Sequence, residues 1–288
     1  MTRGRSNPLS ELAKLGFENL SETVSKLDRL VELVGDWGHS ALTPLASAAS
    51  PDKALDFLLR MAEIQPKAVS KTLSDSSMAE RFCRITGASD AIAEHLLRHP
   101  QSFKLSKKPE LGKNYKVASS SRTDLRVSYR DALIKIIDWD LSQKDPTAAY
   151  RDVSMALTEL TDQTIRSAIE VAIAELMEEG RLKPEDVEPL PLAVIAMGKT
   201  GARELNYVSD VDVIYVATTP DSVDAATKIA TRMQQVIDAV DVEPGLWQVD
   251  PNLRPEGKSG ALVRTLEAHR VYYQKWAEPW EFQALLKA

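Results

Sequence analysis

The amino-acid sequence predicts an α+β protein, with an all-helical N-terminal region followed by a domain built on a small mixed sheet. Apolar residues recur at helical spacing through most of residues 8–183. After the proline-bounded segment 184–189, short apolar runs of strand length alternate with helical stretches. These observations divide the chain into a helical region, residues 1–183, and a second domain, residues 184–288.

The N-terminal region carries a succession of helix signals. Pro51 and Asp52 are typical of a first helical turn, where a proline and an acidic residue are favoured. Gly180 is a plausible C-cap for the last and longest helix. The stretch 102–121 is rich in Lys and Ser, contains Pro109 and Gly112, and is predicted to be a surface loop. Helices are predicted from residues 10 and 51 onward and over residues 91–98, 124–142 and 147–179.

The second domain alternates strands and helices. Its predicted strands cover residues 190–197, 211–216 and 246–250, and its predicted helices cover residues 221–240 and 265–276. The final residues, 280–288, lack a helix stop signal or a polar tail. We therefore expect this domain to be incomplete at its C-terminus and the chain to be part of a longer protein, with an ordinary C-terminal helix as the alternative.

Composition narrows the class of protein. Its 288 residues, 43% hydrophobic and 27% charged, are typical of a soluble globular protein. A formal net charge of −6 argues against a general nucleic-acid binder. The single cysteine, Cys83, excludes an internal disulfide and fits a reducing cytoplasm. No apolar run approaches the ~18 residues that a transmembrane helix needs. We therefore expect a cytoplasmic protein with no membrane or nucleic-acid partner.

Two aspartates one residue apart are the most informative feature. Asp210 and Asp212 stand at the head of the apolar run 211–216, and the glycine-bearing turn 198–201 lies just upstream. Residues i and i+2 of a strand point to the same face, so both carboxylates would project from one side. Two like charges this close usually hold a cation between them. Glycines let a backbone approach the phosphate that this cation would bridge.

Other residues can complete such a site. Asp250 ends the third strand-like run, so its carboxylate can emerge at the same sheet edge and help bind magnesium. Arg254 can clamp a phosphate, and Lys199 can do the same as a point charge. The pattern predicts magnesium-dependent nucleotidyl transfer.

A competing interpretation is a phosphate-binding P-loop. Gly198-Lys199-Thr200 matches the end of that motif, but Ala193 stands where its first glycine should be, and the residues between are strand-like. An isolated Asp-x-Asp pair also occurs on ordinary surfaces, so the prediction depends on the ordered set of glycine turn, paired aspartates and third aspartate.

Two segments resemble the signatures of a known family. They are Ala196-Met197-Gly198-Lys199-Thr200-Gly201-Ala202-Arg203-Glu204-Leu205-Asn206-Tyr207-Val208-Ser209-Asp210-Val211-Asp212 and Val249-Asp250-Pro251-Asn252-Leu253-Arg254-Pro255-Glu256-Gly257-Lys258-Ser259-Gly260. Both look like the glutamine synthetase adenylyltransferase/adenylyl-removing enzyme family. The chain departs from that pattern at Thr200 and Ala202, where the family usually has an aliphatic residue and a glycine, and at Asn252, where a basic residue is usual.

The resemblance implies a DNA polymerase β-like nucleotidyltransferase domain. It implies magnesium held by Asp210, Asp212 and Asp250, which would be the catalytic residues. The nucleotide and phosphate would be bound by residues of the same signatures: Gly198, Lys199, Gly201, Ser209 and Arg254.

The family carries two such domains, which regulate nitrogen assimilation together. The N-terminal copy removes AMP from a tyrosine of glutamine synthetase with phosphate, releasing ADP, and the C-terminal copy adds AMP from ATP. A motif near residue 200, behind a helical region, matches the removing copy. The alternatives are a catalytically silent module that binds glutamine synthetase or a nitrogen-signalling protein, and a nucleotidyltransferase that acts on another substrate.

Overall fold

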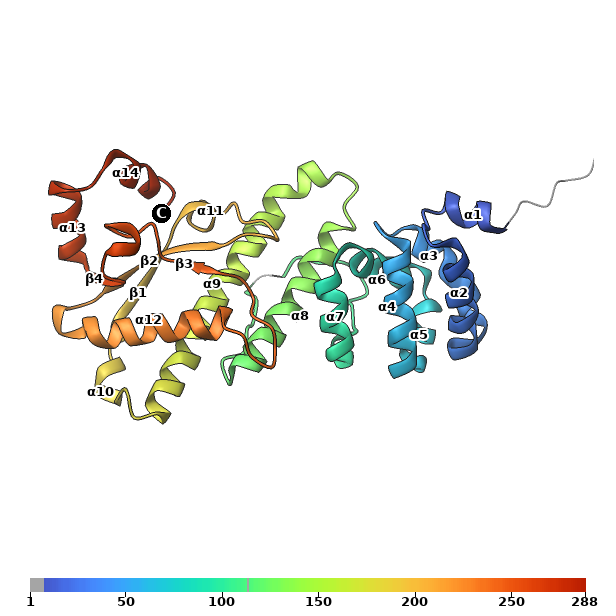
Figure 1. The fold of residues 1–288 in the computed structure, drawn as a ribbon, viewed down its shortest axis with the longest axis horizontal. Coiled ribbons are helices and arrows are strands. Elements are labelled where there is room, and N and C mark those ends of the chain that lie inside the picture. The colour runs from blue at the N-terminus through green and yellow to red at the C-terminus, as the bar shows by residue number, and fades with distance from the viewer. Residues whose placement is uncertain (1–7, 113) are drawn as a thin grey trace, which may run out of the picture. The chain divides into compact units, whose positions relative to one another are not determined.

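The structure, a computed structural model, describes residues 8–112 and 114–288 and contains two compact units (Figure 1). Among the described residues, the first unit contains residues 8–111 and 134–146, and the second contains residues 112, 114–133 and 147–288. Helix α8 (Arg122–Asp140) therefore has its first part in the second unit and its last part in the first. None of the described helices combines the length and the apolar character that a membrane crossing requires.

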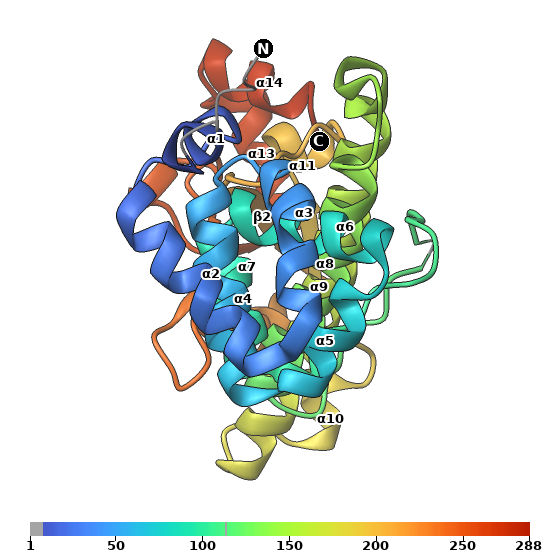
Figure 2. The ribbon, with the colours of Figure 1, turned by 90° about the vertical axis from the view of Figure 1, so that its right-hand side faces the viewer.

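In the described part of the first unit, all regular structure is helical. Helix α2 packs against α4, and α4 packs against α5 and α6 (Figure 2). Helix α4 begins as predicted, with Pro51 in its first turn and the Ser50 side chain accepting a hydrogen bond from the Lys53 backbone N–H. The elements of this unit are α1 (Pro8–Lys14), α2 (Leu20–Val34), η1 (Gly35–Ala41), α3 (Leu42–Ala46), α4 (Pro51–Ile64), α5 (Pro66–Leu73), α6 (Ser76–Ala88), α7 (Asp90–Arg98) and η2 (Pro100–Ser102).

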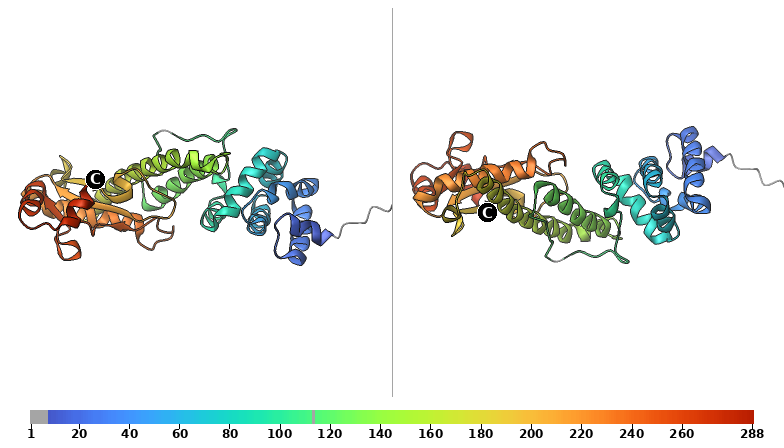
Figure 3. Two further views of the ribbon diagram at one scale, coloured as in Figure 1. Left: turned by 90° about the horizontal axis from the view of Figure 1, so that it is seen from above. Right: turned by 90° about the horizontal axis from the view of Figure 1, so that it is seen from below.

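The helices of the second unit surround a small sheet. The longest, α9, is a single helix that closely follows the predicted range 147–179 (Figure 3). Gly180 ends it with φ +69°, and the backbone N–H of Arg181 donates to the Leu176 carbonyl at 2.8 Å, as the C-cap prediction requires. Besides α8, these helices are α9 (Pro146–Glu178), α10 (Pro184–Val187), α11 (Gly198–Gly201), η3 (Pro220–Ser222), α12 (Val223–Asp238), η4 (Gly257–Ser259), α13 (Leu266–Lys275) and α14 (Pro279–Leu285).

The sheet is mixed and has β2 (Val211–Ala217) at its centre. Strand β1 (Leu192–Ala196) pairs with β2 in antiparallel fashion, while β3 (Val249–Asp250) and β4 (Val263–Thr265) pair with it in parallel. The predicted third strand, residues 246–250, is thus shorter than expected, and β4 was not predicted because three residues are too few to show alternation. The α+β class is confirmed, and the sheet is consistent with a nucleotidyltransferase-like fold.

One face of the sheet is covered by helices. The side chains of Val211, Val213 and Tyr215 are buried in one hydrophobic cluster with residues of α9 and α12, and Figure 1 shows α12 running along the sheet. Residues of β2 at even positions, beginning with Asp212, therefore point to the opposite face. The predicted domain boundary between residues 183 and 184 stays a prediction, and the first strand of the sheet begins at Leu192. The compact units divide elsewhere, because α9 shares its core with the strands.

Candidate active site

Three aspartates meet at the start of the central strand. Asp210 directly precedes β2, Asp212 is the second residue of β2, and Asp250 is the last residue of β3. Asp212 and Asp250 are register partners in the parallel pairing of these strands, so their side chains leave the same face of the sheet. One carboxylate oxygen of each of the three residues lies within 4.8 Å of the others. The structure thus brings together all three acidic residues that the sequence singled out.

The carboxylates influence one another electrostatically. Partial burial raises the pKa of Asp212 above its usual range, and the charges of Asp210 and Asp250 raise this pKa further. The charge of Lys199 lowers the pKa of Asp212, which indicates that the exposed ammonium group lies near the cluster. The ionised cluster repels itself, so a divalent cation between the oxygens would stabilise it.

The donor set fits magnesium, which binds oxygen ligands and commonly uses one or two carboxylates together with substrate phosphates and waters. Asp210 is exposed, and Asp212 and Asp250 are half-buried, so the cluster is open to solvent on one side. Asp250 is oriented by its own loop, since its Oδ1 accepts a hydrogen bond from the Asn252 backbone N–H at 2.7 Å. Asp210, Asp212 and Asp250 are therefore the residues that would hold the ion.

Gly198 lies directly against the cluster. It begins α11 with φ +53°, and a Cβ added to it would lie 2.5 Å from Oδ2 of Asp212. The preceding residue, Met197, donates its backbone N–H to the Asp212 carbonyl at 2.9 Å. A glycine is required here because the turn contacts a carboxylate and also has a left-handed backbone. The P-loop interpretation has no support, because residues 192–196, which that motif would need largely as a loop, form β1.

Gly201 has a different neighbour. A Cβ at this position would lie 2.0 Å from the backbone oxygen of Lys287 and 2.7 Å from that of Ala196. The Lys287 ammonium group also pairs with Glu204 at 2.7 Å. The glycine therefore lets the last turn of the chain pack on α11. Sequence reasoning missed this contact, because nothing in the pattern connects residues so far apart along the chain.

Two other residues predicted to bind phosphate, Ser209 and Arg254, have buried polar atoms. The Ser209 hydroxyl is buried without a hydrogen-bond partner among the described residues and lines a small cavity of about 20 Å³. Arg254 is only 8% exposed. Its guanidinium donates to three backbone carbonyls of its own loop, those of Pro251 at 2.9 Å, Lys258 at 3.1 Å and Gly260 at 3.1 Å. Arg254 therefore organises the loop after β3, and its contact with phosphate stays a prediction.

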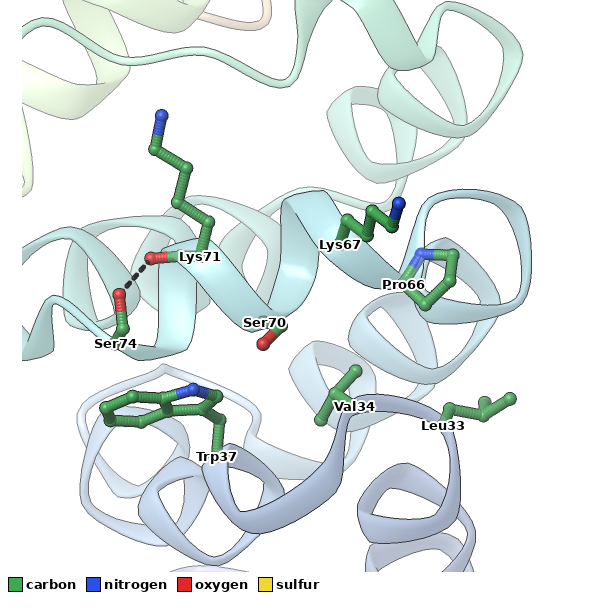
Figure 4. A pocket seen from close by; sticks show the side chains of 8 residues that line it. All are labelled: Leu33, Val34, Trp37, Pro66, Lys67, Ser70, Lys71 and Ser74. Atoms are coloured by element: carbon green, nitrogen blue, oxygen red, sulfur yellow. Dashed lines mark hydrogen bonds between the residues drawn. The ribbon is translucent and has the colours of Figure 1, made fainter.

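The first unit contains a larger hollow with different chemistry. A groove of about 540 Å³ runs between α5 and the end of α2 with η1, and Figure 4 shows Trp37 opposite Ser70, with Lys67 and Lys71 on the same helix as Ser70. None of the described residues that line this groove carries a carboxylate. It therefore lacks the ligands that magnesium prefers, and the aspartate cluster is the candidate for nucleotidyl chemistry.

Replacing Asp212 with asparagine should stabilise the metal-free protein at neutral pH. The raised pKa means that ionised Asp212 destabilises the fold, an effect fully present above the folded pKa and absent below the ordinary aspartate value of 3.8. Asp212→Asn should raise the unfolding temperature by on the order of a degree or two at pH 7. This difference should disappear at acidic pH. Thermal unfolding in the presence of a chelator, measured across pH, tests the expectation.

Asp221→Asn is a suitable control, since Asp221 is exposed in η3, outside the cluster. Its unfolding temperature at neutral pH should equal that of the unaltered chain, because exposed substitutions away from packed or paired groups change stability little. If Asp212→Asn instead destabilised the metal-free protein at neutral pH, the repulsion within the cluster would be disproved.

Comparison with known proteins supports the resemblance. The family model for glutamate-ammonia ligase adenylyltransferase matches residues 79–288. The chain is 39% identical over 318 aligned positions to the bifunctional glutamine synthetase adenylyltransferase/adenylyl-removing enzyme of Leifsonia xyli, covering 100% of this chain and 32% of that protein. It is 39% identical over 315 positions to the protein of the same description from Streptomyces coelicolor, covering 100% and 30%. The chain spans about a third of the length of these curated relatives and matches an N-terminal part of them.

Proposed function

Because this chain belongs to the glutamate-ammonia ligase adenylyltransferase family, we propose that it removes AMP from adenylylated glutamine synthetase by magnesium-dependent phosphorolysis. The convergence of Asp210, Asp212 and Asp250 within 4.8 Å carries this proposal. The chain's match to an N-terminal part of bifunctional relatives supports removal rather than addition of AMP. We also propose, from the resemblance, a cytoplasmic location and regulation by a nitrogen-signalling protein.

The reaction exchanges a phosphoester bond at phosphorus for a phosphoanhydride bond. An oxygen of inorganic phosphate attacks the phosphorus of the AMP–tyrosine diester, and the new P–O bond produces ADP. The bond from phosphorus to the tyrosine oxygen breaks, and that oxygen keeps the electron pair and takes up a proton. Magnesium, when bound, supplies positive charge that stabilises the attacking and leaving oxygens.

The residues of the site have different roles in this reaction. Asp210, Asp212 and Asp250 would hold the ion, which would supply positive charge near the phosphate groups. Asp250, on the same face of the sheet as Asp212, would also orient the attacking oxygen. Lys199, whose charge influences Asp212, adds a cation near the phosphates. Gly198 keeps the turn close enough to Asp212 for these groups to act together.

Isotope labelling tests the direction of the reaction. The 288-residue chain is incubated with adenylylated glutamine synthetase, magnesium and ³²P-labelled inorganic phosphate. We expect labelled ADP to form. No ADP of any kind should form when phosphate is omitted, and no labelled ADP should form when unmodified glutamine synthetase is supplied. In the parallel reaction, unmodified glutamine synthetase is supplied with ATP labelled at its α-phosphate, and the protein should stay unlabelled.

Each other outcome has a defined meaning. Transfer of AMP from ATP to glutamine synthetase, without phosphorolysis, would reverse the proposed direction. Failure of both reactions, with retained binding of glutamine synthetase in a pull-down, would favour the silent binding module.

A further inference from the structure

The strand that carries Asp250 is too short to fix this residue by itself. Strand β3 consists only of Val249 and Asp250, and residues 239–248 before it form neither helix nor strand. A strand of two residues forms few ladder hydrogen bonds, so it cannot hold a carboxylate firmly opposite Asp212. Metal sites need their ligands placed to within a fraction of an ångström. Other contacts must therefore hold the 239–248 loop.

Arg130 of helix α8 provides one set of such contacts. Its Nη1 donates to the Glu243 carboxylate at 3.0 Å, and its Nη2 donates to the backbone carbonyls of Pro244 at 2.7 Å and Gly245 at 2.8 Å. Both Arg130 and Glu243 are buried. The planar guanidinium thus fixes three successive residues of the loop, a geometry that a point charge cannot reproduce.

Arg126, one turn earlier on α8, binds the same region and is fully buried. Its Nη1 donates to the Glu243 carbonyl at 2.6 Å, and its Nε donates to the carbonyl of Val236, near the end of α12, at 3.0 Å. The two arginines therefore tie the end of α12 and the middle of the loop to one helix.

The backbone between Gly245 and Asp250 is held by contacts with the end of α12 and with β2. A Cβ at Gly245 would lie 2.7 Å from the Asp238 carbonyl, so the loop passes close to the end of α12. Leu246 donates its backbone N–H to the Ile237 carbonyl at 2.9 Å, and the Gln248 carbonyl accepts from Val211 at 3.0 Å. Asp250 follows two residues later, so the arginine contacts, together with those of Leu246 and Gln248, set the path of the backbone that leads to the metal ligand.

We propose that Arg126 and Arg130 are positioning residues that set the location of Asp250 in the metal centre. They act through the 239–248 loop and touch neither substrate nor ion. The inference rests on the proposed magnesium site but not on the direction of the reaction. It assigns to α8 a role that the sequence did not indicate, because neither arginine lies in a signature segment.

Binding of Mn²⁺, a spectroscopic substitute for magnesium, tests this role directly. The 288-residue chain with Arg130→Gln is titrated with Mn²⁺ by electron paramagnetic resonance, well below its unfolding temperature. We expect a dissociation constant about 10–100-fold higher than that of the unaltered chain, the usual effect of removing a residue that supports a metal ligand. Hydrogen exchange of residues 243–250 should accelerate in the same variant.

Arg122→Gln is the matched control. Arg122 lies on the same helix and forms two hydrogen bonds with Glu175 of α9, at 2.6 and 2.7 Å, rather than with the loop. Its loss should lower the unfolding temperature without changing Mn²⁺ affinity. If Arg130 had a purely structural role, Arg130→Gln would also lower the unfolding temperature without changing Mn²⁺ affinity.

Arg130→Lys keeps the positive charge but not the planar fork, and it serves if Arg130→Gln fails to fold. We expect intermediate Mn²⁺ affinity. Unchanged affinity and unchanged loop exchange in a folded Arg130 variant would overturn the inference. Absence of Mn²⁺ binding by the unaltered chain would instead overturn the metal site of the proposed function.

Discussion

The double variant Asp210→Asn with Asp212→Asn is expected to lose AMP release by about 10³-fold or more while keeping its fold. Both side chains belong to the cluster whose carboxylate oxygens lie within 4.8 Å of one another. Stabilisation of phosphoryl charge by a bound metal ion contributes several kcal/mol, and each ~1.4 kcal/mol is a factor of ten in rate. The measurement is phosphate-dependent ADP formation from adenylylated glutamine synthetase, together with circular dichroism of the variant.

The unfolding temperature of the double variant distinguishes loss of the metal ligands from misfolding. The variant relieves charge repulsion at a half-buried position, so without metal it should unfold at or above the temperature of the unaltered chain. Added magnesium should raise the unfolding temperature of the unaltered chain only, since a ligand stabilises the state that binds it. Release of AMP at the rate of the unaltered chain would refute the role of both aspartates.

Gly198→Ala is expected to weaken Mn²⁺ binding and AMP release by at least about tenfold and to lower stability by about 1–2 kcal/mol. The new Cβ would lie 2.5 Å from Oδ2 of Asp212, and the backbone at this position has φ +53°. Either the turn or the carboxylate must move, and both belong to the site. Steady-state kinetics, Mn²⁺ titration and chemical unfolding measure the three effects.

Gly180→Ala is the control that separates backbone strain from the contact between position 198 and Asp212. Gly180 has a similar left-handed backbone, φ +69°, but a Cβ there would meet nothing within 4 Å. It should show the loss of stability from backbone strain and keep normal metal binding and activity. Equal activity of the Gly180 and Gly198 variants would show that the approach of Gly198 to Asp212 has no functional consequence.

The sequence predicted the features that depend on local pattern. Helix α9 and its Gly180 cap follow from apolar periodicity and a glycine at the right place. Strand β2 follows from a short run of β-branched and aromatic residues. The meeting of Asp210, Asp212 and Asp250 was predictable because each aspartate lies at the end of a strand-like segment.

The features that depend on distant contacts were not predictable. Strand β4 has three residues, so only its pairing with β2 defines it. Arg254 was expected to bind phosphate, yet its guanidinium meets carbonyls of a loop whose path no local pattern describes. The same holds for Arg126, which is fully buried and binds backbone more than a hundred residues away. Such charges look like surface residues until the tertiary fold is known.

The close passage of the Lys287 backbone over Gly201 makes two distant positions of the chain depend on each other. A side chain at position 201 would overlap a main-chain oxygen, and a main-chain atom cannot be turned aside as a flexible side chain can. Exchange of this glycine for a residue with a side chain therefore requires the backbone at residue 287 to take another path. The two positions should vary as one unit, although 85 residues separate them.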